Sequence, residues 1–189
     1  MILRRLALSA LVLASALPPA GAQTPRPASA PGGTAPVMTG LQRGNAFGEW
    51  RFWAGDAFST RYSPLDQINA SNFDSLGVAW QWNAGTFGPD EYYRTTPLYA
   101  NGRLFTVATT RRSVMAIDPE TGETLWMYRL EEGIRWQKAP RQFAGRGPSY
   151  WTDGREERIF YVTSGYELVG LDAKTGRPLQ DFGKDGGGD

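Results

Sequence analysis

The chain has 189 residues, of which 41% are hydrophobic and 13% aromatic, and its formal net charge is +1. The balanced mixture of acids and bases argues against a nucleic-acid partner, and because Cys and His are absent, zinc sites of the Cys/His type, thiol catalysis, haem attachment and a Ser/His/Asp triad are excluded within these residues. Seven Trp and 23 Gly among short apolar runs favour an all-β fold.

Residues 1–22 have the layout of a secretory signal peptide. Arg4 and Arg5 precede an apolar run at residues 6–17, and Ala20-Gly21-Ala22 matches the small-x-small pattern of a cleavage site. An uncleaved membrane anchor is the alternative, but an anchor needs roughly 20 apolar residues, more than this run provides. We therefore expect cleavage after Ala22 and a mature protein that works in the periplasm or is otherwise exported.

A change in composition marks the start of the folded domain. Residues 23–46 are rich in Pro, Ala, Gly, Thr and Ser, so they cannot bury enough apolar surface to fold, and they are predicted to be a disordered linker. From Phe47 onward aromatic side chains become frequent. We expect residues 47–189 to form the folded part of the chain.

Short strand candidates follow in chain order. Residues 78–83 (VAWQWN) alternate between apolar and polar side chains, which predicts a half-buried strand. The next two runs are joined by Asn101-Gly102, a strong hairpin signal, and the two after them by a turn that contains Pro119 and Gly122. Four antiparallel strands are therefore predicted at residues 96–100, 103–109, 113–118 and 124–129.

The same pattern recurs further along the chain. Strands are predicted at residues 148–151, 158–163 and 167–172, with a short fourth strand near Leu179. Asp118 and Asp172, which end the third strand of each unit, lie 54 positions apart. A four-stranded unit that repeats at about 40–55 residues is typical of a β-propeller blade. The sequence thus predicts an all-β fold in which two four-stranded antiparallel sheets lie side by side as adjacent blades.

The residues shared by the two units have structural roles. Asp118 and Asp172 can accept hydrogen bonds from backbone N–H groups of the turns that follow them, and Gly122 and Gly176 can adopt the positive φ that such turns require. Trp126 is expected to be largely buried against the neighbouring blade. We interpret all of these residues as scaffold rather than as catalytic groups.

Several segments resemble one enzyme family. The string AIDPETGETLW, residues 116–126, resembles the tryptophan-docking motif of the quinoprotein dehydrogenases, and the second copy departs from it at Gly170 and Gln180. The string GRGPSYW, residues 145–151, resembles the Arg-Gly-x-x-Tyr segment of the same family. The resemblance extends over about 140 residues, from Gly48 to the end of the chain.

The resemblance implies a function for the parent protein. The family fold is an eight-bladed propeller with pyrroloquinoline quinone (PQQ) on its axis beside one Ca²⁺, and its members oxidise an alcohol or a sugar and pass electrons to a membrane quinone or a cytochrome. The family's Asp base and Ca²⁺ ligands lie further along than this chain reaches, so no catalytic residue or metal ligand is expected here. We interpret the chain as a truncated N-terminal part with about two and a half blades, inactive alone.

Three arginines are candidate cofactor ligands, two by the same resemblance and one by its place at a strand tip. Arg146 occupies the Arg of the Arg-Gly-x-x-Tyr segment, which contacts PQQ in the family, and Arg94 stands where some relatives carry a Glu that touches the cofactor. Arg111 and Arg112 lie at the tip between two strands, so either side chain could face the axis, and we select Arg112. The alternative for each of these arginines is a solvated surface side chain.

Two other functions compete with a dehydrogenase. A scaffold lipoprotein built from the same repeat needs a lipidated Cys directly after its signal peptide, and this chain has no Cys. A generic extracellular binding propeller is the second alternative.

Overall fold

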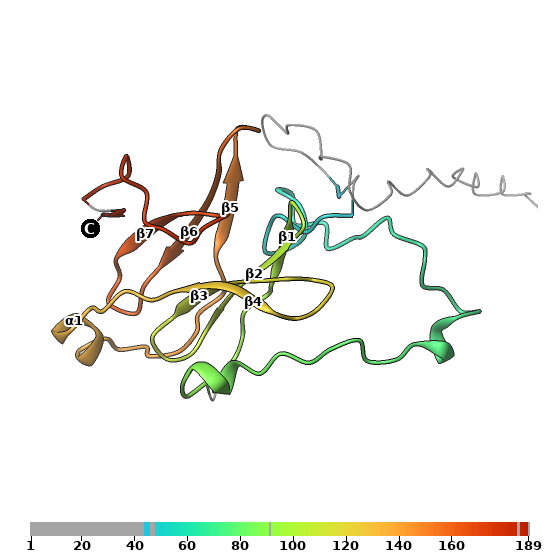
Figure 1. The fold of residues 1–189 in the computed structure, drawn as a ribbon, viewed down its shortest axis with the longest axis horizontal. Coiled ribbons are helices and arrows are strands. Elements are labelled where there is room, and N and C mark those ends of the chain that lie inside the picture. Colours follow the sequence, from blue (N-terminus) through green and yellow to red (C-terminus); the bar gives the residue numbers. More distant parts are fainter. Residues whose placement is uncertain (1–43, 46–47, 91, 185, 189) are drawn as a thin grey trace, which may run out of the picture.

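In this computed structural model, the structure describes residues 44–45, 48–90, 92–184 and 186–188. Two four-stranded antiparallel sheets form its regular core (Figure 1). Helices in this part of the chain are a single turn each, and none is long and apolar enough to cross a membrane. They are η1 (Phe73–Ser75), η2 (Ala84–Phe87) and α1 (Ile134–Gln137). The architecture confirms the predicted all-β, partial-propeller fold, whereas the predicted signal peptide and linker residues 23–43 and 46 lie outside the described residues.

The first sheet contains its strands in chain order and confirms the predicted hairpins. Asn101 and Gly102 both have positive φ, 51° and 72°, as a two-residue type I′ turn requires. The register places Leu98 opposite Phe105 and Ala116 opposite Trp126. The strands are β1 (Leu98–Ala100), β2 (Arg103–Ala108), β3 (Ser113–Ile117) and β4 (Thr124–Tyr128).

The second sheet repeats this order but differs from the prediction at its fourth strand. Its strands are β5 (Ser149–Thr152), β6 (Glu157–Val162), β7 (Leu168–Asp172) and β8 (Gly187–Gly188). The short strand expected near Leu179 is reduced to an isolated bridge between Pro178 and Leu171, flanked by hydrogen bonds from the Asp172 N–H to the Arg177 carbonyl at 2.8 Å and from the Leu179 N–H to the Gly170 carbonyl at 3.0 Å. The Leu179 side chain packs over Gly170, where a Cβ would lie 3.1 Å from it.

The segment at residues 78–83 is extended but is not the predicted strand. Among the described residues no other segment pairs with it, so its backbone lacks the partner that a strand needs. Its two tryptophans attach it to the first sheet instead: Trp80 Nε1 donates to the Pro119 carbonyl at 2.9 Å, and Trp82 Nε1 donates to Thr124 Oγ1 at 3.1 Å. The predicted alternation is nevertheless present, since these two rings are half-buried while their neighbours are exposed.

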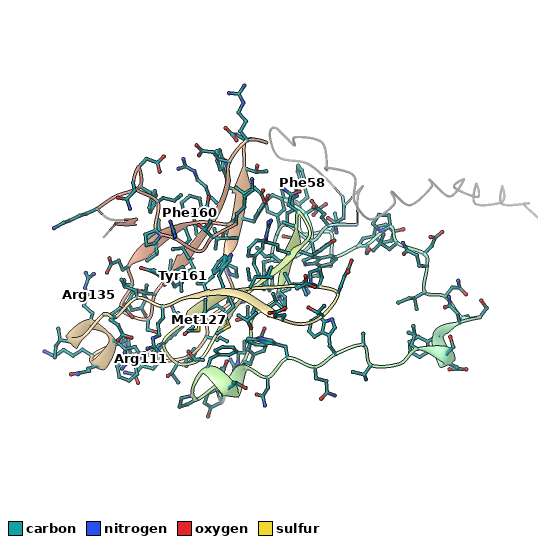
Figure 2. All side chains as sticks on the ribbon, in the orientation of Figure 1. Phe58, Arg111, Met127, Arg135, Phe160 and Tyr161 are labelled. Carbon is teal, nitrogen blue, oxygen red and sulfur yellow. The ribbon has the colours of Figure 1, made fainter. Side chains whose placement is uncertain are left out.

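The two sheets pack face to face through one apolar cluster. Phe105 of β2 stacks on Tyr150 of β5, with ring centroids 6.0 Å apart. Each fully buried Val, Leu, Ile or Phe side chain in such a core contributes roughly 1.5–3 kcal/mol. Figure 2 shows the side chains between the sheets, where Tyr161 is labelled. The cluster includes Leu98, Phe105, Val107 and Val114 from the first sheet and Tyr150, Ile159, Tyr161, Val169 and Leu171 from the second.

The repeated turns have the predicted geometry. Asp118 Oδ1 accepts backbone N–H groups from Glu120 at 2.8 Å and Thr121 at 2.9 Å, and these bonds hold the pKa of the Asp118 carboxyl below its ordinary value. Asp172 accepts from the equivalent backbone groups of its own turn. Gly122 and Gly176 have φ of 75° and 69°, as predicted.

Trp126 links the first sheet to the turn of the second. Its Nε1 donates to the Ala173 carbonyl at 3.1 Å, and its ring lies so close to Gly176 that a Cβ there would be 2.5 Å from the ring. Most of the ring surface is buried against the apolar core, as predicted, and the rest is exposed because β4 is the outermost strand of its sheet. Trp80 contacts Pro119 and Gly122 in the same way, so both indoles dock onto equivalent turns.

Candidate functional site

The direction of the strands determines which connections lie at the same end of the molecule. Consecutive strands of each sheet run antiparallel, so every second connection lies at the same end. The turns that receive Trp80 and Trp126 lie at one end. The opposite end gathers the residues before β1, the β2–β3 turn, the long β4–β5 loop and the β6–β7 turn.

A cleft of about 870 Å³ opens at this opposite end. Among the described residues, its lining includes four arginines from three of those connections and no carboxylate. We call it the arginine cleft, and its arginines are Arg94, Arg112, Arg141 and Arg146. The structure therefore brings together all three arginines singled out from the sequence and adds a fourth, Arg141.

Arg146 is presented by glycines on both sides. Gly145 and Gly147 have φ of 80° and 113°, and a Cβ on Gly147 would lie 3.1 Å from the Thr95 side chain and 3.2 Å from the Thr96 carbonyl oxygen. Only glycine suits both the conformation and the close approach. The exposed Arg146 guanidinium lies over the Trp53 ring, 5.9 Å from its centroid.

Arg112 is bonded to the walls of the cleft. Its Nε donates to the Phe143 carbonyl at 3.0 Å, and its Nη1 donates to the Val162 and Thr163 carbonyls at 3.0 and 2.8 Å. These bonds join the β2–β3 turn to the long loop and to the second sheet. Burial lowers the pKa of the half-buried Arg112, but an arginine stays protonated at neutral pH, so its charge remains in the cleft wall.

We expect Arg112→Ala to lower the free energy of unfolding by about 2 kcal/mol, because charge-assisted hydrogen bonds to three carbonyls are lost. Arg111→Ala is the matched control: Arg111 pairs with partly exposed Glu131 at 2.7 Å, and exposed pairs contribute about 0–1 kcal/mol. Urea unfolding of the two variants measures the difference. Equal losses would mean that the Arg112 bonds do not hold the loop.

Arg94 lies at the edge of the cleft over another aromatic ring. Its guanidinium is 5.9 Å from the centroid of Tyr92, and the Tyr92 ring contacts Phe143 of the long loop edge-on at 6.2 Å. The side chain is exposed. Arg94 is thus placed beside the cleft by an aromatic contact, and no described carboxylate forms an ion pair with it.

Arg111, the other arginine of the β2–β3 tip, is not among the residues that line the cleft. Besides its ion pair with Glu131, its guanidinium lies 4.2 Å from the centroid of Trp136 in α1, and Figure 2 shows it near this helix. This placement supports the choice of Arg112 over Arg111 as the one that faces the cleft.

Sequence reasoning missed the residues that fix the long loop. Glu132 Oε1 accepts hydrogen bonds from the Thr163 hydroxyl at 2.5 Å and from the Gly165 N–H at 2.7 Å. These bonds attach the loop to the β6–β7 turn. Arg141 lies on the same loop, five residues before Arg146. The sequence signal for Arg141 is its position just before the Gly-Arg-Gly segment.

In the part of the chain that the structure describes, no group of three or more His, Cys, Asp or Glu side chains gathers as a metal site. The cleft is strongly cationic, and guanidinium groups are suited to carboxylates because their planar fork donates two parallel hydrogen bonds. The chemistry offered by these residues is the binding and orientation of an anionic, acceptor-rich ligand.

Residues 50–189 match the family model described as "PQQ: Glucose/ethanol/alcohol dehydrogenase, beta-propeller domain". The chain is 34% identical over 173 residues to the dehydrogenase subunit of a quinone alcohol dehydrogenase from Gluconobacter oxydans, covering 89% of this chain and 20% of that protein. It is 33% identical over 135 residues to the quinohemoprotein alcohol dehydrogenase ADH IIB of Pseudomonas putida, covering 71% of this chain and 18% of that protein.

A solved structure agrees with these relatives. The quinohemoprotein alcohol dehydrogenase of Comamonas testosteroni superimposes with a TM-score of 0.55 at 31% identity, covering 69% of this chain and 18% of that one. The chain spans about a fifth of the length of the curated relatives it matches. Because the family model covers residues 50–189 and the sheets form two consecutive blades, the chain belongs to the PQQ-dependent glucose, ethanol and alcohol dehydrogenase family, within its β-propeller domain.

Proposed function

We propose that the complete protein is an exported PQQ-dependent dehydrogenase that oxidises an alcohol or a sugar, and that the arginine cleft forms part of its PQQ site. The observation that carries this proposal is the convergence of Arg94, Arg112, Arg141 and Arg146 on one cleft, whose described lining residues include no carboxylate. The family membership of the chain supports the assignment.

The residues present fit PQQ, which is a quinone tricarboxylate. A volume of about 870 Å³ lies within the range of roughly 300–1,000 Å³ that is typical of small-molecule pockets. The guanidinium donors match carboxylate and quinone oxygens, and the glycines on both sides of Arg146 let its segment pack closely against Thr95, Thr96 and Arg112. When bound, PQQ accepts the hydride equivalent that leaves the alcohol carbon.

The residues of this chain would bind and orient the cofactor rather than move protons. Arg146 donates to the ligand from the mouth of the cleft, and Arg112 holds the long loop that carries Arg146. None of the described residues that line the cleft has a carboxylate that could act as a base. We therefore propose that the Asp base and the Ca²⁺ ligands belong to parts of the protein outside these 189 residues, and that a membrane quinone or a cytochrome accepts the electrons.

The test is dye-linked oxidation of primary alcohols and of glucose by the complete protein, freed of cofactor and assayed with and without PQQ in the presence of Ca²⁺. We expect oxidation only when PQQ is added. No oxidation, together with no binding of PQQ, would favour the alternative of a non-catalytic binding or scaffold propeller.

The export part of the proposal predicts a mature protein that begins at Gln23. The short apolar run and the Ala20-Gly21-Ala22 pattern support cleavage after Ala22. Mass spectrometry of the protein recovered from the periplasmic fraction would determine the N-terminus. Recovery of a cell-associated product that retains Met1 would contradict export by cleavage.

A further inference from the structure

Arg94 and Arg146 occupy the same position in consecutive blades. Phe105 and Ile159 are 54 positions apart, the same interval that separates the Asp residues of the two turns. Leu98 of β1 pairs with Phe105 of β2, and Tyr150 of β5 pairs with Ile159 of β6. Arg94 is four residues before Leu98, and Arg146 is four residues before Tyr150. The repeat therefore places an arginine just before the first strand of each blade, β1 and β5.

A third guanidinium comes from the long loop, beside the same two. Arg141 is two residues before Phe143, whose ring contacts Tyr92 at 6.2 Å, and Tyr92 in turn lies under Arg94 at 5.9 Å. Both Arg94 and Arg141 line the arginine cleft together with Arg146. An aromatic chain thus connects the loop of Arg141 to the segment of Arg94.

The charges of these three arginines are not neutralised within the described residues. Several other arginines are paired with carboxylates, among them Arg111 with Glu131, Arg135 with Glu167, and Arg158 with Asp181. Arg94 and Arg146 instead lie over aromatic rings, and neither they nor Arg141 has an ion pair in the parts of the chain that the structure describes. A ring face orients a guanidinium and leaves its N–H edge available to an anion.

We propose that Arg94 and Arg141 form a carboxylate-binding subsite beside Arg146, so that the cleft selects polycarboxylate ligands over neutral ones. The carboxylates have two candidate sources. The first is the cofactor PQQ itself, and for this source the proposal rests on the proposed function. The other source is a substrate that carries a carboxylate, such as a hydroxy acid or a sugar acid. Because three guanidinium groups converge, the subsite matches a ligand with several carboxylates better than one with a single charge.

The experiment compares Arg94→Gln, Arg141→Gln and the double variant in the complete protein. Arg155→Gln is the matched control, since it removes an exposed arginine from the β5–β6 turn at the opposite end of the blades. Apo-protein is titrated separately with PQQ and with citrate, and KM is measured for ethanol and for gluconate. Thermal unfolding of each variant reports on structural damage.

We expect the wild-type protein to bind citrate as well as PQQ, with affinities that fall as ionic strength rises. Each single variant should lose about tenfold in affinity, as expected for one charge-assisted bond, with an unchanged unfolding temperature. A loss confined to PQQ identifies the cofactor as the source, and a raised KM for gluconate with unchanged PQQ affinity identifies the substrate.

Two results separate this proposal from the proposed function. If the wild-type protein binds citrate through Arg94 and Arg141 but does not bind PQQ, the subsite stands and the proposed cofactor is wrong. If the Arg94 and Arg141 variants match Arg155→Gln for every ligand, the carboxylate subsite is overturned even when PQQ binds well.

Discussion

Arg146→Ala is expected to weaken PQQ binding by up to about a hundredfold while leaving the unfolding temperature unchanged. A charge-assisted hydrogen bond contributes roughly 1.5–3 kcal/mol, which corresponds to about ten- to a hundredfold in a dissociation constant. The fold should tolerate the change, because the Arg146 side chain is exposed and its described contact is the face of the Trp53 ring. Titration of the complete apo-protein with PQQ in the presence of Ca²⁺ measures the effect.

Arg146→Lys is the informative comparison. Lysine keeps the positive charge but cannot reproduce the planar fork, so only part of the affinity should return. Equal PQQ affinities in wild type and Arg146→Ala would remove Arg146 from the site while leaving the enzyme assignment intact.

Trp126→Ala is expected to lower the free energy of unfolding by about 3 kcal/mol, the lower end of the range for buried Trp-to-Ala changes. The ring is partly exposed, but it links two sheets: it covers Gly176, and its Nε1 donates to the Ala173 carbonyl at 3.1 Å. The substitution removes the ring contact and the hydrogen bond together. Chemical denaturation of the complete protein measures the loss.

Trp126→Phe separates the two contributions. A phenyl ring can still cover Gly176 but cannot donate to Ala173, so we expect a loss of about 1 kcal/mol, the net value of one hydrogen bond. A loss below about 1 kcal/mol for Trp126→Ala would show that this residue does not stabilise the junction between the blades.

The repeated elements could be predicted from the sequence because they depend on local chemistry. The hairpin at Asn101-Gly102 requires positive φ at both positions, and these residue types adopt it readily. The turns after Asp118 and Asp172 are closed by carboxylates that accept nearby N–H groups. Each of these features involves residues that are close in sequence, so a pattern of a few letters was sufficient.

The misassigned elements depend on partners that are distant in sequence. Residues 78–83 alternate as a strand does, but a strand also needs a neighbour, and none pairs with them among the described residues. The fourth strand of the second sheet lies at Gly187–Gly188, whereas the segment near Leu179 forms only an isolated bridge with β7 and packs its side chain over Gly170. Hydrophobic alternation cannot reveal either circumstance.

The candidate site was predicted in part for the same reason. Resemblance identified Arg94 and Arg146, the strand tip indicated Arg112, and the structure adds that all three line one cleft. The sequence could not indicate that Arg112 donates to three carbonyls, or that Glu132 holds the long loop by hydrogen bonds, because those contacts join residues 31 to 51 positions apart. Arg141 became a candidate through its place in the cleft.

The most direct test of the account is a crystal structure of the complete protein with PQQ bound. The account predicts PQQ at the end of the blades that carries the β2–β3 turn, with its carboxylates contacting Arg146 and the neighbouring guanidinium groups of the arginine cleft. PQQ bound at the opposite end, beside the turns that receive Trp80 and Trp126, or bound without any contact to the arginine cleft, would contradict it.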